Sequence, residues 1–246
     1  MKNEIDFLYE AAEDEIEILS EIIRNKGGVN CSLKSRDKYE NKNKYIKATV
    51  DELLKYGSYT FGREKEYIEI LKDVCKKMKV KYDNDDEMGK NLLLEVFGMI
   101  YKDLSDEKKI EINNGIFGDE NYRKKYYEEG GFFSFENIFK NADIHLLYIL
   151  ASTIAGSVAM SMIGRGLSLA SSVFFSRALS ILSGPLAAIM AVWTIKELAG
   201  PAYRVTIPAV IYIESIRIME EVREISGKTY VDSINGSDKN DGVIYL

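Results

Sequence analysis

The stretch IHLLYILASTIAGSVAMSMIG (144–164), followed by GLSLASSVFFS (166–176) and ALSILSGPLAAIMAVWTI (178–195), decides how the rest of the chain can fold. Its only full charges are Arg165 and Arg177, whereas 29% of the whole chain is charged. The spans 144–164 and 178–195 both approach the ~20 residues that cross a bilayer. His145, Pro185 and several Ser and Thr residues lower their apolar character. A buried core element and a membrane-inserting element therefore both remain open.

Small residues recur in this stretch at every fourth position, a spacing that places them on one face of a helix. Such ridges let two helix backbones approach closely, which favours helix pairing in lipid and is also found in tightly packed cores. We predict that the later ridge faces a membrane or a partner protein. The candidate residues are Gly164, Ser168, Ser172, Ser176, Ser180 and Gly184, and the preceding segment has a ridge of Ala151, Ala155 and Ala159.

The fold class expected is all-α, a multi-helix bundle with the apolar, small-residue-rich stretch as a central helical hairpin. Three prolines in 246 residues and long runs of Glu, Lys, Ile and Leu favour helices. We expect an N-terminal helical module (1–28) and an amphipathic helical domain (43–141). The apolar hairpin and a C-terminal helix (144–225) follow, packed with the preceding helices, and then a flexible tail (226–246). A hydrophobic content of 46% is enough for a sizeable core.

Charge and cysteine content exclude several functional classes. The net charge of −6 argues against a nucleic-acid partner, because phosphate binding needs a concentrated basic surface. Cys31 and Cys75 lie far apart, which predicts neither a disulfide framework nor a zinc site. The acidic run DNDDE (83–87) lacks the glycine and the final acid of a calcium loop, so we interpret it as a helix N-terminal cap. No cofactor or metal is expected.

Arg204 lies in the run GPAYRVTIPAV (200–210), which is otherwise apolar and contains Pro201 and Pro208. A charged side chain in such surroundings needs a carboxylate, backbone carbonyls, a lipid headgroup or water. We interpret Arg204 as a buried ionic or hydrogen-bonded anchor, with an anion site as the alternative. A helix is expected to resume at Ala209.

Three blocks of the chain resemble the bacterial YaaW-like family of uncharacterised proteins. They are IDFLYEAAEDEIEILSEII (5–23), REKEYIEILKDVCKKMKVKYD (63–83) and AYRVTIPAV (202–210). The family is grouped with a ubiquinol-cytochrome c chaperone-like superfamily, and this grouping implies a helical protein that handles membrane-protein assembly. The resemblance implies no reaction and carries no catalytic residue over to this chain.

Two functions follow as hypotheses. The first is a non-enzymatic interaction protein, chaperone-like and membrane-associated, that uses its apolar helical region to bind a membrane or a membrane-protein client. The alternative is a membrane-permeabilising protein whose hydrophobic hairpin is sheltered inside the bundle. An enzyme is not expected, because the sequence has a single histidine and lacks a nucleophile motif or phosphate loop. The start of the chain lacks the apolar core of a signal peptide, which predicts a cytoplasmic protein with peripheral or conditional inner-membrane association. Homo-oligomers are compatible with these hypotheses.

Overall fold

The computed structural model describes residues 4–58, 63–116, 144–165, 173–194 and 202–234, and within these ranges the chain is all-helical, without a strand. This confirms the all-α class. The α-helices are α1 (Glu13–Gly27), α2 (Lys42–Gly57), α3 (Tyr67–Met78), α4 (Met88–Lys102), α5 (Asp106–Ile116), α8 (Ile144–Ile163), α9 (Val173–Thr194) and α10 (Tyr203–Ile234). Short 3-10 helices span Asp6–Tyr9, Gly28–Asn30, Arg36–Lys38 and Asp85–Glu87.

Helix starts follow from side chains that bind the first free backbone N–H groups. The Asn41 side chain accepts a hydrogen bond from Lys44 N (2.9 Å) at the start of α2. Asn84 accepts from Glu87 N (3.1 Å), which begins the 3-10 turn that leads into α4. The acidic run before α4 therefore lies at a helix N-terminus, as the sequence predicts.

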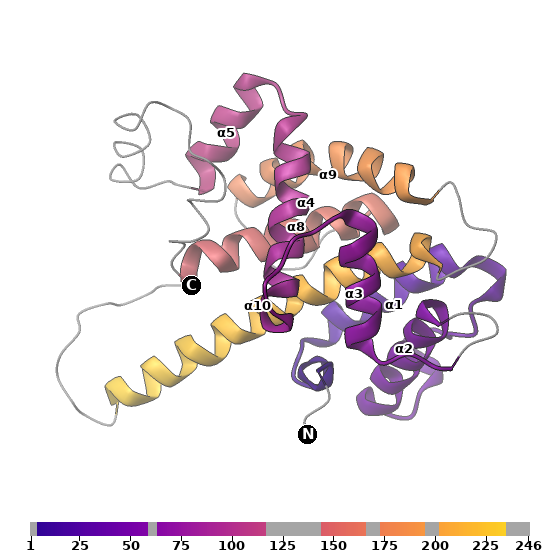
Figure 1. Cartoon of the computed structure of the whole chain (residues 1–246). Helices are drawn as coiled ribbons and strands as arrows, with labels where there is room; N and C mark the ends of the chain where they lie inside the picture. Colours follow the sequence, from indigo (N-terminus) through magenta and orange to yellow (C-terminus); the bar gives the residue numbers. More distant parts are fainter. Residues whose placement is uncertain (1–3, 59–62, 117–143, 166–172, 195–201, 235–246) are drawn as a thin grey trace.

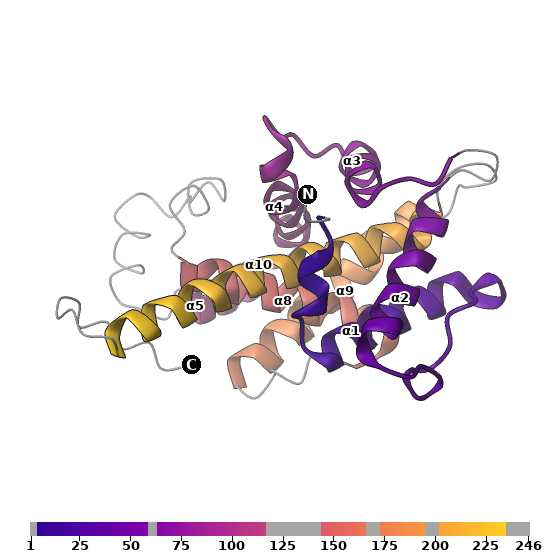
Figure 2. The same ribbon diagram turned by 90° about the horizontal axis from the view of Figure 1, so that it is seen from below.

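Helix α10 is the element around which the others pack. It contacts α1, α2, α3, α4, α8 and α9, and it crosses the middle of the molecule (Figure 1). Seen from below, α3 and α4 lie on one side of it and α1, α8 and α9 on the other (Figure 2). All residues of 205–216 are buried. The sequence analysis placed this central role in 144–195, so α10 corrects that expectation.

Helix α8 belongs to the protein core. Its residues 150–159 are all buried, and the ridge of Ala151, Ala155 and Ala159 lies fully inside, while α8 makes its most extensive contacts with α10 and α9. Of the helices in the described ranges, none is both long enough and apolar enough to cross a membrane. The link 166–172 lies outside the described residues, so the hairpin connection stays a prediction.

Helix α9 continues through Pro185. A proline disfavours the helical conformation of the residue before it, because its Cδ collides with that residue's Cβ and N–H. Gly184 occupies this position and has no Cβ, which removes part of the collision. The pair Gly184–Pro185 therefore gives a physical reason why α9 does not break here.

A buried carboxylate ties α10 to α3 and α4. Glu214 is 2% exposed, accepts a hydrogen bond from the Tyr67 hydroxyl (2.5 Å) and pairs with Arg217 (3.0 Å). Gly89 of α4 packs directly against the same carboxylate, and a Cβ at this position would overlap Glu214 Oε2. Because an unpaired buried charge is costly, these contacts fix how the three helices fit together.

A second buried carboxylate ties α10 to α1. Glu15 is 2% exposed and pairs with Arg223 (2.8 Å), while its Oε2 accepts from Ala12 N (2.9 Å) at the start of α1. The Tyr212 hydroxyl donates to the backbone oxygen of Glu15 (3.2 Å). The N-terminal turn of α1 is thus held against the middle of α10.

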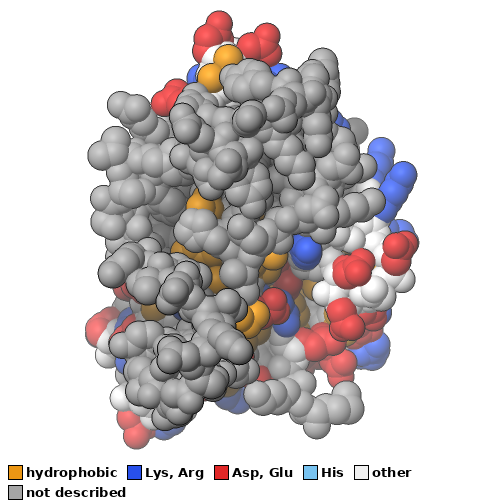
Figure 3. Space-filling model, turned by 90° about the vertical axis from the view of Figure 1, so that its left-hand side faces the viewer, with side chains coloured by type: hydrophobic (Ala, Val, Ile, Leu, Met, Phe, Trp, Pro, Cys, Tyr) orange, Lys and Arg blue, Asp and Glu red, His pale blue; other side chains and the backbone are white. Residues whose placement is uncertain are grey.

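The three regions expected from sequence share one hydrophobic cluster, which extends from Ile5 to Met219 and includes residues of α1–α5 and α8–α10. Helix α10 continues to Ile234, through residues that the sequence analysis assigned to a flexible tail. The remainder of that tail, 235–246, and the aromatic segment 117–143 lie outside the described residues. On the face shown in Figure 3, hydrophobic side chains near the middle lie beside charged ones, and further charged side chains lie around the edge.

Two glycines of α4 give a matched test of the contact with Glu214. We expect Gly89→Ala to lower the free energy of unfolding by about 2–3 kcal/mol, because the new methyl group displaces the buried carboxylate. Nothing lies within 4 Å of a Cβ at Gly98, so Gly98→Ala is expected to raise the free energy by about 0.5–1 kcal/mol. Urea unfolding followed by circular dichroism measures both changes. Equal changes in the free energy of unfolding would contradict the direct packing of Gly89 against the Glu214 carboxylate.

Candidate functional site

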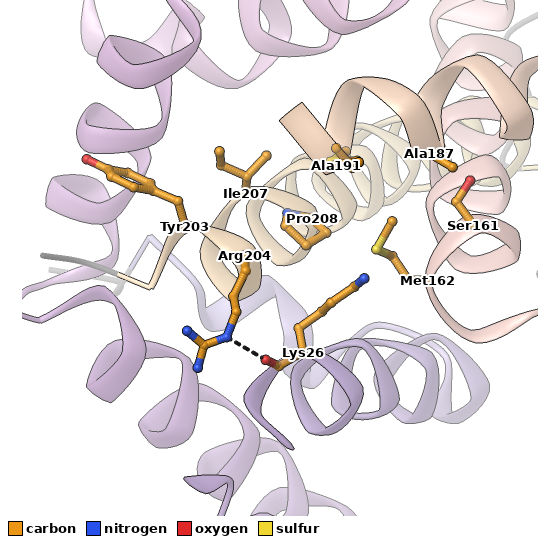
Figure 4. Close-up of a pocket in the computed structure, with 10 residues that line it drawn as sticks. Lys26, Ser161, Met162, Ala187, Ala191, Tyr203, Arg204, Ile207 and Pro208 are labelled. Atoms are coloured by element: carbon orange, nitrogen blue, oxygen red, sulfur yellow. Dashed lines mark hydrogen bonds between the residues drawn. The ribbon is translucent and has the colours of Figure 1, made fainter. Parts of the chain in front are cut away.

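A groove of about 200 Å³ lies where several helices end. The C-terminal ends of α1 and α8, the C-terminal half of α9 and the first turns of α10 meet there (Figure 4). Its walls are mostly apolar, with two cationic side chains and a hydroxyl group among them. The lining residues are Lys26, Ser161, Met162, Ala187, Met190, Ala191, Tyr203, Arg204, Ile207 and Pro208.

Arg204 anchors the start of α10 to the end of α1. Its Nε donates a hydrogen bond to the backbone oxygen of Lys26 (3.0 Å), drawn as a dashed line in Figure 4. This is the hydrogen-bonded form of the anchor expected from sequence, but the residue is half-buried rather than buried. The structure also begins α10 at Tyr203 rather than Ala209. Helix α10 continues through Pro208, which has no N–H to donate to the Arg204 carbonyl four residues earlier.

Lys26 brings a second cation to the groove. It lies in the last turn of α1, and Figure 4 shows its side chain extending toward Met162. Within the described ranges, its ammonium group forms no ion pair. The sequence analysis did not single out Lys26. No local pattern could have placed it beside Arg204, because the two are brought together by packing between distant helices.

The small residues expected on one ridge fall into separate elements. Gly164 follows α8 with a φ of 75°, a left-handed conformation that ends the helix, and nothing lies within 4 Å of where its Cβ would be. Gly164 therefore does not mediate close helix packing. Ser168 and Ser172 lie outside the described residues, and Ser176 belongs to α9 but its side chain is not described.

The outer surface of α9 is apolar and built from small residues. Ser180, Gly184, Ala188 and Ala191 are exposed, and their spacing places them along one side of the helix. We call these four residues the α9 face. Behind it, the Ser161 hydroxyl of α8 donates to the backbone oxygen of Ser183 (2.8 Å), which holds α9 against α8.

Charged residues outside the lining of the groove, at the end of α8 and in α2, bind neighbouring groups. Arg165, one of the two charges in the apolar stretch, lies beside Glu21 (3.0 Å) and Glu17 (3.8 Å) of α1. The Glu52 carboxylate is 5% exposed and accepts from Ser32 N (3.1 Å). Burial alone would raise the pKa of Glu52, but hydrogen bonds from Ser32 and Lys55 lower it overall. In the described ranges, no group of three or more His, Cys, Asp or Glu residues is arranged to hold a metal ion.

Cys75 of α3 is a buried residue of the core. Burial, together with the charge of Glu214, raises the pKa of Cys75 to about 12. Cys31 is half-exposed, and burial also raises its pKa. Because the thiolate is the reactive form of cysteine, this environment suppresses the reactivity of Cys75.

A thiol-reactivity experiment tests the environment of Cys75. We expect the Cys31→Ala variant to be inert toward a disulfide reagent at pH 8 and to react fully in urea. Since the unfolded thiol ionises near pH ~8.5, the stabilising contribution of the neutral Cys75 is present below that pH. It is expected to be lost as the pH rises toward 12. Rapid labelling of the folded variant would contradict the buried placement.

The anchor formed by Arg204 is tested by removing its donor. We expect Arg204→Met to lower the free energy of unfolding by about 1–2 kcal/mol, because a charge-assisted hydrogen bond is lost. Arg24→Met is the control, since Arg24 makes a long ion pair with Glu21 (3.8 Å) and should cost less than about 0.5 kcal/mol. Thermal and urea unfolding measure the change in the free energy of unfolding in both variants. Similar losses in the two variants would refute the anchoring role.

Comparison with known proteins assigns the chain to a family. It is 33% identical over 211 residues to a UPF0174 protein of Helicobacter pylori strain J99, an alignment that covers 78% of each chain. A second UPF0174 protein of that strain is 29% identical over 186 residues (71% of this chain, 88% of the relative). The UPF0174 protein YaaW of Escherichia coli K12 is 29% identical over 168 residues, covering 67% of this chain and 65% of YaaW.

No family model matches the chain, and no solved structure matches it significantly. The relatives confirm the YaaW-like resemblance, while the wider chaperone-like grouping stays a prediction. The chain belongs to the UPF0174 family.

Proposed function

We propose that the protein is a non-enzymatic interaction protein that binds an apolar helix of a client protein along the α9 face, in the manner of a chaperone. The exposed small residues of this face carry the proposal. Ser180, Gly184, Ala188 and Ala191 offer a smooth apolar surface to a partner.

The two sides of α9 differ in side-chain size. Leu182, Leu186 and Met190 are buried on the inner side, whereas the outer side has no side chain larger than Ser at the four positions of the α9 face. Small residues allow a second helix to approach closely, so that van der Waals contacts form along both backbones. The same residues expose little apolar area when no partner is bound, which keeps such a surface compatible with water.

The burial of α8 favours this proposal over the membrane-permeabilising alternative. Release of α8 would expose residues 150–159, which now pack against α10, α9 and α1. Each fully buried Leu or Ile would lose about 1.5–3 kcal/mol on transfer to water. A client helix bound on the α9 face requires no such opening of the core.

A charge on the α9 face tests the proposal. The probe is a fluorescein-labelled synthetic helix of alternating Leu and Ala residues with terminal lysines, whose binding is followed by fluorescence anisotropy. We expect the wild-type protein to bind it and Ala188→Lys to weaken binding at least ~10-fold, because an unpaired charge would be buried in the interface.

Asn43→Lys provides the matched control, because Asn43 is an exposed residue in the first turn of α2, away from the α9 face. It adds the same charge and is expected to leave peptide binding unchanged. The proposal fails if wild-type protein does not bind the peptide or if the two lysine variants bind it equally. Size-exclusion chromatography with light scattering shows whether a second copy of the chain occupies the face instead.

A further inference from the structure

We propose that the groove between α1, α8, α9 and α10 selects the client of the α9 face by charge. It receives one acidic side chain of the bound helix and pairs that carboxylate with the Lys26 ammonium. This inference rests on the proposed function, because the client is the helix that binds the α9 face. It adds the chemical class of that client, which is an apolar helix with a Glu residue on the side that faces the groove.

The groove lies directly beside the α9 face. Ala191 is exposed, belongs to that face and also lines the groove. Ala187, one turn earlier in α9, lines the groove as well. A helix bound along the α9 face therefore passes over the groove. Because the two alanine side chains are short, they leave room for a long side chain of the bound helix.

Lys26 supplies the groove with one cation. Its ammonium group forms no ion pair within the described ranges, and its side chain extends toward Met162 of α8 (Figure 4). The Arg204 guanidinium points away from that ammonium (Figure 4), and Arg204 Nε binds the Lys26 backbone oxygen. The groove therefore offers a charge to a single carboxylate at Lys26, rather than to a ligand shared by both cations.

The backbone around Lys26 is held from two sides. Arg204 Nε donates to the Lys26 carbonyl oxygen (3.0 Å), and the side chain of the preceding residue, Asn25, donates to the backbone oxygen of Met162 (3.3 Å). These contacts tie the end of α1 to α10 and to α8, so the lysine side chain starts from a fixed point beside the groove. A group that is positioned before binding loses less conformational freedom when it pairs with a ligand.

The size and the lining of the groove suit a Glu side chain. A volume of about 200 Å³ equals that of roughly six to seven water molecules, which is enough for this side chain. Its methylene groups would lie against Met162, Met190 and Ile207, where apolar contact contributes to binding. An ion pair formed inside the groove is partly shielded from water, which strengthens it relative to a pair on an open surface.

Pairs of peptides that differ in one charge test this inference. The fluorescein-labelled helix of Leu and Ala residues is made with either Glu or Gln at one position, and this position is moved residue by residue along the peptide. We expect wild-type protein to bind the Glu form about fivefold more tightly than the Gln form at the position that faces the groove. The chain has a net charge of −6, so its overall field favours the Gln form, and a preference for Glu requires a local cation.

Substitutions of Lys26 assign that cation. Lys26→Gln is expected to bind the two forms equally, and Lys26→Arg is expected to keep the preference for Glu because it retains the charge. Lys26→Glu is expected to prefer a peptide with Lys at the same position. Fluorescence anisotropy measures all of these affinities.

Lys76→Gln is the matched control. Lys76 is an exposed lysine in the last turn of α3, as Lys26 is in the last turn of α1, so the two Gln variants lose the same charge and the same interaction with a helix C-terminus. Lys76→Gln is expected to prefer the Glu form as the wild type does. Circular dichroism and thermal unfolding verify that the variants remain folded.

The outcomes separate this inference from the proposed function. Equal binding of the Glu and Gln forms at every position overturns the inference, and so does a preference for Glu that persists in Lys26→Gln or disappears in Lys76→Gln. If both forms bind equally and Ala188→Lys still weakens binding, the proposed function stands and this inference alone fails. If neither form binds wild-type protein, both fail.

Discussion

Burial of residues 205–216 of α10 on all sides is the constraint on which the rest of the fold depends. A helix whose residues 205–216 are all buried needs neighbours around its whole circumference, and six other α-helices supply them. The carboxylate of Glu214 is inside this shell, and burying it is tolerable only because the Tyr67 hydroxyl and Arg217 bind it. The requirement to satisfy this charge, together with the close fit of Gly89, gives the arrangement of helices a specificity that apolar packing alone does not provide.

The groove follows from the same arrangement. Helix α10 begins at Tyr203, at the point where α1 and α8 have ended, and helix ends cannot pack as closely as helix sides because their free carbonyl groups need partners. Arg204 satisfies one of these carbonyl groups at the end of α1. The hollow that remains is therefore lined by apolar residues from the helix sides and by cations that suit helix C-termini. Stability of the junction between α1 and α10 explains why cations lie there.

Local periodicity predicts much of this fold, because each helix follows from the spacing of its own apolar residues. The acidic run 83–87 leads into α4 at Met88, as the sequence analysis predicts, and the all-α class is confirmed. Contacts between distant segments were not predictable in the same way. The central role of α10, the proximity of Lys26 to Arg204, and the capping role of Gly164 depend on packing or on a backbone angle. The spacing of four residues also placed Gly164 and Ser180 on one predicted ridge. In the structure, Gly164 follows the end of α8 and Ser180 lies in α9.

The pairing of buried charges is the strongest guide to where function can lie. The buried carboxylates Glu15, Glu52 and Glu214 each bind a neighbouring donor, so their charges are used in holding helices together. A catalytic carboxylate needs a substrate within reach, whereas these three are buried among the groups that bind them. Arg204 differs from these paired charges. It lies at the groove, without a carboxylate beside it in the described part of the chain. The fold pairs its other described arginines with acidic side chains, whereas it uses Arg204 to bind a backbone oxygen at the end of α1.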